Sequence, residues 1–142
     1  MAMDKVEVGR PQRLTFGDLR REPGGQVLSM TVTVELESLT ARREVVASYV
    51  SGFADLAGFF TDLGENWRGW IGTRTYESIE HDLLLEAVHT GSHVELHFTL
   101  QNLEASSSWS LRGKLTLDAG EELMRGSDDL RELLSHPPVD AS

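Results

Sequence analysis

The chain has 142 residues, a formal net charge of −10 and no cysteine. Its length suits one domain with its own hydrophobic core, and the lack of cysteine excludes disulfides, thiolate nucleophiles and zinc–cysteine sites. The N-terminal residues lack the apolar segment of a signal peptide, and no apolar run approaches the roughly 20 residues of a membrane-spanning helix. We therefore expect one cytoplasmic domain, residues 1–142, with no membrane contact.

The charge is distributed unevenly along the chain. Residues 1–75 hold ten acids and nine bases, whereas residues 76–142 hold thirteen acids and four bases. An acidic half repels phosphate backbones, which argues against direct nucleic-acid binding, and it attracts basic partners. The alternative is that the acids only keep the protein soluble.

Alternating apolar and polar residues predict a β-meander over the first fifty residues. Residues 13–19 predict a strand with Leu14 and Phe16 facing inward, and Pro-Gly-Gly shortly after it predicts a turn. The alternation is clearest over residues 26–38, and a further strand is expected over residues 41–50. The residues expected on the buried face of the 26–38 strand are Leu28, Met30, Val32, Val34 and Leu36.

The periodicity changes to that of a helix at Ser51, which we expect to be the N-cap. Gly58 and Gly64 lower the helix propensity, and a close approach of the helix to the sheet would explain both. An apolar stripe of this kind is typical of a core rather than of a ligand site. The stripe consists of Phe53, Leu56, Ala57, Phe60, Leu63, Gly64 and Trp67.

Residues 65–80 combine three aromatic residues with two arginines. The aromatic residues are Trp67, Trp70 and Tyr76, and Arg68 and Arg74 lie between them. We favour an aromatic lid over one end of the core. The alternative is a binding surface, because Trp, Tyr and Arg are the usual residues of binding hot spots. The acidic surroundings argue against a stacking platform for nucleic acid.

Residues 81–101 predict a β-hairpin with Gly91 and Ser92 in the turn. A shift of one residue would set the apolar row of one strand against the polar row of the other, so the register is well defined. The expected pairs are Thr90 with His93, Ala87 with Leu96, and Leu85 with Phe98. The expected core face holds Leu83, Leu85, Ala87, His89, Val94, Leu96, Phe98 and Leu100.

A last strand is expected over residues 109–117, followed by a C-terminal helix. Asp118 and Glu121 resemble a capping box at the start of this helix, which Gly126 could interrupt. Residues 136–142 are expected to form a flexible tail. No internal repeat or linker is evident. The pattern as a whole predicts an α+β fold: an antiparallel sheet of about six to seven strands packed against one central amphipathic helix, plus the C-terminal helix.

No motif in the sequence identifies a reaction. His93 and His97 would lie about 13 Å apart on one strand face, too far to share a metal ion, and His89 would face the core. Glu86 falls opposite His97, where a cross-strand ion pair is sufficient to explain both residues. No nucleophile stands beside them. We therefore expect no catalytic residue, no metal and no cofactor.

A series of short motifs carries a resemblance to a known family. In chain order they are WRGW-x-G, Y-x-S-I-E, L-x-L-x-A and G-x-H-V-x-L-x-F-x-L, within residues 53–101. They resemble a bacterial domain family of uncharacterised function, found mainly in actinomycete-type genomes, which is similar to the WapI-type immunity proteins of polymorphic toxin systems. Thr90 and Ser92 depart from the family's turn pattern. The matching residues are Trp67, Gly69, Trp70, Gly72, Tyr76, Ser78, Glu80, Leu83, Leu85, Ala87, His89, His93, Val94, Leu96 and Leu100.

This resemblance implies a small non-catalytic protein that binds another protein and neutralises a toxin, whose basic surface the acidic half would attract. Two alternatives remain open. One is a small-molecule-binding or enzymatic domain with a pocket between helix and sheet, lined by Trp67, Trp70, Tyr76 and His89. The other is a homodimer or larger scaffold joined through sheet edges or the helix. The candidate binding surface consists of Trp67, Arg68, Trp70, Arg74, Tyr76, Glu86, His93, Glu95 and His97.

Overall fold

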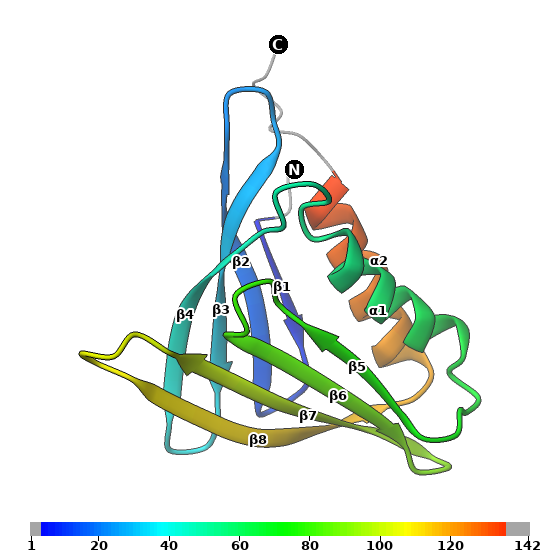
Figure 1. Cartoon of the computed structure of the whole chain (residues 1–142). Coiled ribbons are helices and arrows are strands. Elements are labelled where there is room, and N and C mark those ends of the chain that lie inside the picture. Colours follow the sequence, from blue (N-terminus) through cyan, green and yellow to red (C-terminus); the bar gives the residue numbers. More distant parts are fainter. Residues whose placement is uncertain (1–3, 136–142) are drawn as a thin grey trace.

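The computed structural model describes residues 4–135, which form two four-stranded antiparallel sheets, each followed by a helix (Figure 1). Neither described helix has the length and apolar character to cross a membrane. The α+β class and the antiparallel pairing are confirmed, whereas one sheet of six to seven strands around one helix is wrong. The first half comprises β1 (Lys5–Val8), β2 (Arg13–Arg21), β3 (Val27–Glu35), β4 (Thr40–Val46) and α1 (Ala54–Glu65). The second comprises β5 (Thr73–Glu77), β6 (Leu83–His89), β7 (His93–Asn102), β8 (Trp109–Asp118) and α2 (Glu121–Ser135).

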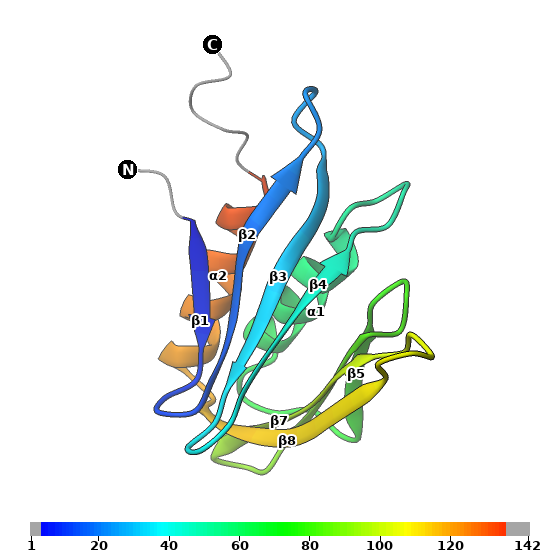
Figure 2. The same cartoon turned by 90° about the vertical axis from the view of Figure 1, so that its left-hand side faces the viewer.

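The two sheets are set at a steep angle to each other, and the helices lie side by side against their inner faces (Figures 1 and 2). The helices contact each other, α1 contacts β5, and α2 contacts β1. The helix that follows the second sheet therefore lies against the first strand of the first sheet. The buried apolar residues of both sheets and both helices form one cluster.

The first sheet follows the predicted alternation in most places. Leu14 and Phe16 of β2 are fully buried, as are Met30, Val32 and Val34 of β3. Leu28 is exposed instead, because the β2–β3 register is irregular at this end: β2 has an extra residue between Gly17 and Arg20, and Leu28 is itself the extra residue of β3 between Val27 and Ser29. The strand predicted over residues 41–50 is β4, which ends at Val46 rather than at residue 50. Strands β1 and β5, of four and five residues, were not predicted.

Helix α1 begins two residues later than predicted. Phe53 occupies the N-cap position without a side-chain hydrogen bond, and Ser51 contributes only its carbonyl, which accepts from the Ala54 N–H at 3.0 Å. A Cβ on Gly64 would lie 3.5 Å from the Cβ of Ser127, whereas Gly58 has open space. The close approach expected at both glycines therefore occurs at Gly64 alone, and the neighbour is α2 rather than the sheet.

The second sheet contains the predicted hairpin in the predicted register, with Leu85 opposite Phe98 and Ala87 opposite Leu96. Helix α2 continues through Gly126 without a break. Its capping differs from the prediction, because the Asp118 N–H donates to Glu122 (2.8 Å) rather than to Glu121. The tail expected over residues 136–142 lies outside the described residues.

A buried ion pair connects the two sheets. Asp82, at the start of β6, is 2% exposed, and its carboxylate faces the guanidinium of Arg43 from β4 (Nε–Oδ2 3.4 Å). The Ser78 hydroxyl donates to the other oxygen of Asp82 at 2.7 Å. Because both carboxylate oxygens have partners, the charge is accommodated inside the fold.

Candidate functional site

The aromatic–arginine stretch lies beside the end of α1, and most of its polar atoms have partners within the chain. The indole N–H of Trp70 donates to the carbonyl of Ala87 at 3.3 Å. The guanidinium of Arg74 pairs with Asp62 of α1 and lies 5.7 Å from the Trp70 ring. These contacts attach Trp70 to β6 and join Arg74 of β5 to α1.

His89 fixes the segment between α1 and β5. Its Nδ1 accepts the Gly91 N–H at 3.0 Å, so the ring proton resides on Nε2, which donates to the carbonyl of Trp67 at 2.7 Å. The Trp70 ring packs edge-on against the imidazole at 5.2 Å between centroids. Gly69 has a φ of +145° close to this ring. His89 is therefore a structural residue that holds Trp67 in place.

Tyr76 lies in the core rather than on the surface. It is 7% exposed, and its ring lies 6.3 Å from that of Phe59 on α1. Burial raises the pKa of Tyr76, and the negative charges of Asp55 and Asp82 raise it further. Tyr76 thus anchors β5 to α1 and is not available to a partner.

The other predicted surface residues lie on the outer face of the second sheet. His97 pairs with Glu95 of its own strand (3.4 Å), and Lys114 of β8 reaches the same carboxylate (3.5 Å). Glu86 is opposite His97 in the register, as predicted, but the expected ion pair between them is wrong, because His97 pairs with Glu95 instead. His93 lies at the hairpin turn, where its Nδ1 is 3.0 Å from the Ser92 hydroxyl. The structure therefore places these four residues on one face and the Trp67–Arg74 group on the other.

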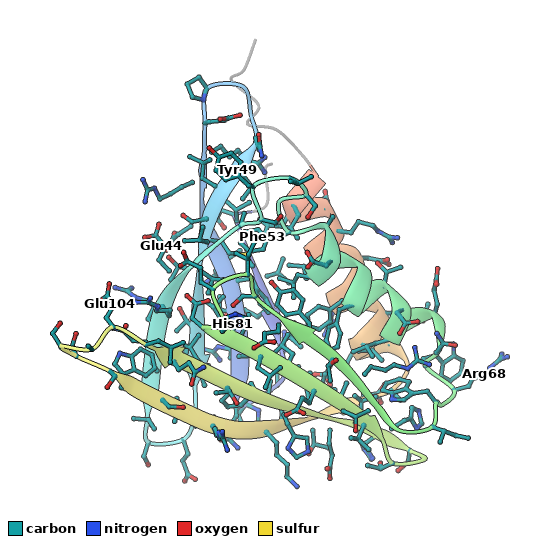
Figure 3. All side chains as sticks on the ribbon, in the orientation of Figure 1. Glu44, Tyr49, Phe53, Arg68, His81 and Glu104 are labelled. Carbon is teal, nitrogen blue, oxygen red and sulfur yellow. The ribbon has the colours of Figure 1, made fainter. Side chains whose placement is uncertain are left out.

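A groove of about 690 Å³ lies between Trp67 and α2. It was not predicted from the sequence. Trp67 and Met124 are 37% and 46% exposed. Arg68 projects outward at this corner (Figure 3), and its guanidinium carbon lies 5.1 Å from the centroid of the Trp67 ring. The groove is lined by Trp67, Gly120, Glu121, Met124, Arg125, Asp128 and Asp129. We call it the Trp67–Met124 groove.

Among the helices and strands, the net negative charge lies in the helices. Helices α1 and α2 together contain eight acids and two arginines, whereas the eight strands contain eight acids and nine bases. Among residues 4–135 no group of three or more histidines and carboxylates is placed to hold a metal ion. The sequence showed only that residues 76–142 are more acidic than residues 1–75. The structure shows that part of this excess belongs to α2, and that α1 of the first half is acidic as well.

A second cleft, of about 620 Å³, lies at the opposite ends of the two helices. It is bordered by Arg21, Phe53, Arg131 and Leu134, and by Tyr49, which is 94% exposed (Figure 3). The guanidinium of Arg21 is held by the carbonyls of the β2–β3 turn and of α2. No sequence motif indicated this cleft, because its walls come from three separate segments of the chain.

Comparison with known proteins identifies a family. The model of a family of unknown function, DUF6228, matches residues 5–137. Searches of curated proteins and of solved structures give no significant match.

Proposed function

The chain belongs to the DUF6228 family, and on that premise we propose that it is a non-catalytic protein-binding domain whose Trp67–Met124 groove receives a basic segment of a partner protein. The observation that carries the proposal is the composition of the groove: an exposed tryptophan and an exposed methionine beside the carboxylates of Glu121, Asp128 and Asp129.

Each part of the groove favours a basic partner. A lysine or arginine can stack on the Trp67 ring, and the Arg68 guanidinium already lies over this ring within the chain. Met124 is a flexible apolar side chain suited to an adaptable contact. The carboxylates of α2 add charge complementarity, which raises the association rate and selects against acidic partners. Arg125 is a basic residue in the lining, and Asp128 already pairs with Arg131 of its own helix at 2.6 Å. We expect the partner's cations to bind on the Asp128–Asp129 side, where they compete with Arg131 for Asp128.

The resemblance to immunity proteins supplies the class of partner. A toxin domain that acts on nucleic acid needs a basic surface, and an acidic helical layer can cover such a surface. In this role the protein neutralises the toxin by occlusion, needs no catalytic group of its own, and works in the cytoplasm.

The proposal predicts that a groove variant loses its partner while a sheet variant with the same change in charge keeps it. The groove variant is Trp67→Ala with Asp128→Asn and Asp129→Asn; the control is Glu86→Gln with Glu104→Gln, on the second sheet and the β7–β8 loop. Immobilised wild-type, groove and control proteins are exposed to host lysate, and the partner is then purified for calorimetry. Because one aromatic contact and two ion pairs are removed, we expect binding about 100-fold weaker for the groove variant.

Two results would contradict the proposal. Equal retention on all three proteins would show that binding follows net charge alone. Recovery of no protein by the wild type at low salt would leave the groove without a partner.

The 620 Å³ cleft supports a second candidate function, the binding of a small molecule, because its volume is within the usual range of ligand sites. Thermal-shift measurements with a metabolite panel distinguish the two functions. A compound that stabilises the wild type but not Tyr49→Ala would favour the cleft over the groove.

A further inference from the structure

Strand β8 is one of the two edge strands of the second sheet, the other being β5, and it lies at the lower side of the molecule in Figure 1. It pairs with β7 over its whole length, from Asn102 opposite Trp109 to His93 opposite Asp118. Among the described residues, no strand lies on the other side of β8. Helix α2 lies against β1, α1 lies against β5, and α2 also contacts β8, where the Asp118 N–H donates to Glu122 at the end of the strand.

The hydrogen bonds of the hairpin show which backbone groups of β8 point away from β7. The N–H of Gln101 donates to Asp82, and the carbonyl of His93 accepts from Thr90, so the odd-numbered residues of β7 face β6. The even-numbered residues of β7 therefore face β8 and bond to its odd-numbered residues. The residues of β8 whose N–H and C=O groups point to the free side are Ser110, Arg112, Lys114 and Thr116.

These four residues form an unpaired edge of eight backbone groups. None of these groups has a hydrogen-bond partner among the described residues, and all four residues are exposed. An edge of this kind accepts a further strand by backbone pairing. The Asp118 N–H, next in the same row, already donates to Glu122 and marks the end of the free stretch.

We infer that the β8 edge binds an extended acidic segment of a partner protein, which adds a fifth strand to the second sheet. The side chains of Arg112 and Lys114 lie on the outer face beside this edge, where acidic side chains of an added strand would lie opposite them. On the inner face Trp109 and Leu111 remain partly exposed, so the added strand should carry apolar residues at alternate positions. This inference concerns a different surface from the Trp67–Met124 groove and does not depend on it.

A second copy of the chain fits this edge poorly. The two symmetric antiparallel registers that pair most of β8 are centred on Gly113 and on Lys114. The first sets Arg112 opposite Lys114 of the other copy, and the second sets the two Lys114 residues opposite each other. Like charges directly opposite destabilise a strand pair, so charge favours an acidic strand over a second β8.

The test uses synthetic peptides as long as β8. The probe alternates glutamate and valine and is N-methylated on one edge so that it cannot stack on itself. The control peptides are a lysine–valine version and a glutamate–valine version methylated on both edges. Binding is measured by calorimetry at about 0.15 M salt, where charges beyond roughly 8 Å are screened. The binding site is located from amide chemical shifts.

We expect the one-edge glutamate peptide to bind and to shift the amides of Ser110, Arg112, Lys114 and Thr116, and both control peptides to fail. Thr116→Pro removes an N–H that points to the free side and so leaves the β7 ladder intact. We expect it to weaken binding about tenfold or more, because a bond is lost and the ring obstructs the added strand. Thr116→Ala should bind within about twofold of wild type.

Three outcomes would overturn the inference. One is failure of the glutamate peptide to bind. Another is a dimer of the wild type that Thr116→Pro dissociates, because the occupant is then a second copy. The last is self-association of the double variant Arg112→Thr, Lys114→Thr with no peptide binding by the wild type. That result would mean that the two cations only protect the edge from aggregation.

Discussion

Gly113 of β8 lies directly beneath the ring of Phe98, which is why this strand position has no side chain. A Cβ at Gly113 would fall 2.6 Å from the Cζ of Phe98, and that ring is buried. We predict that Gly113→Ala lowers the free energy of unfolding by about 1–3 kcal/mol, the usual cost of overpacking a core. Urea unfolding measures the change.

Gly58 provides the matched control for this prediction. It lies within α1, and a Cβ there has nothing within 4 Å. Gly58→Ala should therefore raise the free energy of unfolding by about 0.5–1 kcal/mol, because it reduces the freedom of the unfolded chain at no steric cost. Equal effects of the two substitutions would contradict the packing argument at Gly113.

The buried phenol of Tyr76 makes stability dependent on alkaline pH. Its pKa is raised in the folded state, mainly by burial, so the unfolded chain loses this proton first as the pH rises. The contribution to stability is complete below about pH 10, the ordinary pKa of tyrosine, and is lost above it. Between about pH 9 and pH 11 we expect the wild type to lose more unfolding free energy than Tyr76→Phe. Parallel losses would show that other groups cause the change.

Sequence patterns predicted which face of the sheet a residue lies on better than they predicted which residues it contacts. The alternation placed His89 on the core side of the hairpin, and it does lie there, but its main contact is the carbonyl of Trp67, 22 residues away. Periodicity within a strand indicates the face of a residue and carries no information on which distant segment covers that face. For the same reason the Trp67–Met124 groove, formed by a loop and a helix far apart in the chain, could not be predicted.

At the scale of elements, the Arg43–Asp82 pair is the charged contact that joins β4 to β6. Removal of Arg43 leaves Asp82 buried without its cation, so we predict that Arg43→Met lowers the free energy of unfolding by about 2–4 kcal/mol. Arg42, the next residue of β4, points to the outer face, and Arg42→Met should change stability by less than about 0.5 kcal/mol. Urea unfolding of both variants checks this. Equal losses of unfolding free energy in the two variants would mean that any positive charge on β4 contributes to stability, whether or not it pairs with Asp82.

The strands and helices were largely predictable, and their division into two sheets was not. Alternation and helical periodicity located β2, β3, β4, β6, β7, β8 and both helices, because each has enough residues for a pattern to repeat. Strand β1 has four residues, too few for its two buried valines to be recognised. Strand β5 has five residues and lies between irregular segments, so no alternating pattern identified it or showed that the two groups of four strands form separate sheets.

At the scale of the whole molecule, the two halves have the same order of elements, four strands and then a helix, although no repeat was visible in the sequence. Each half exposes an apolar inner face that its own helix does not cover alone. Helix α2 lies against β1 and α1, and the core residues of both halves form one cluster. Neither half therefore has a complete core without the other.

This shared core predicts that residues 4–135 unfold as one cooperative unit. Leu130 of α2 is fully buried, and Leu130→Ala should cost about 2–5 kcal/mol. If the halves unfold together, hydrogen exchange of Val32 in β3 and of Leu96 in β7 will show the same opening free energy, and Leu130→Ala will lower both equally. The wild type in urea should likewise give coincident transitions by far-UV circular dichroism and by tryptophan fluorescence, since Trp109 belongs to the second half and Trp67 and Trp70 lie against its α2 and β6. A loss of protection at Leu96 with none at Val32 would mean that the first sheet is stable by itself and that the chain contains two folding units.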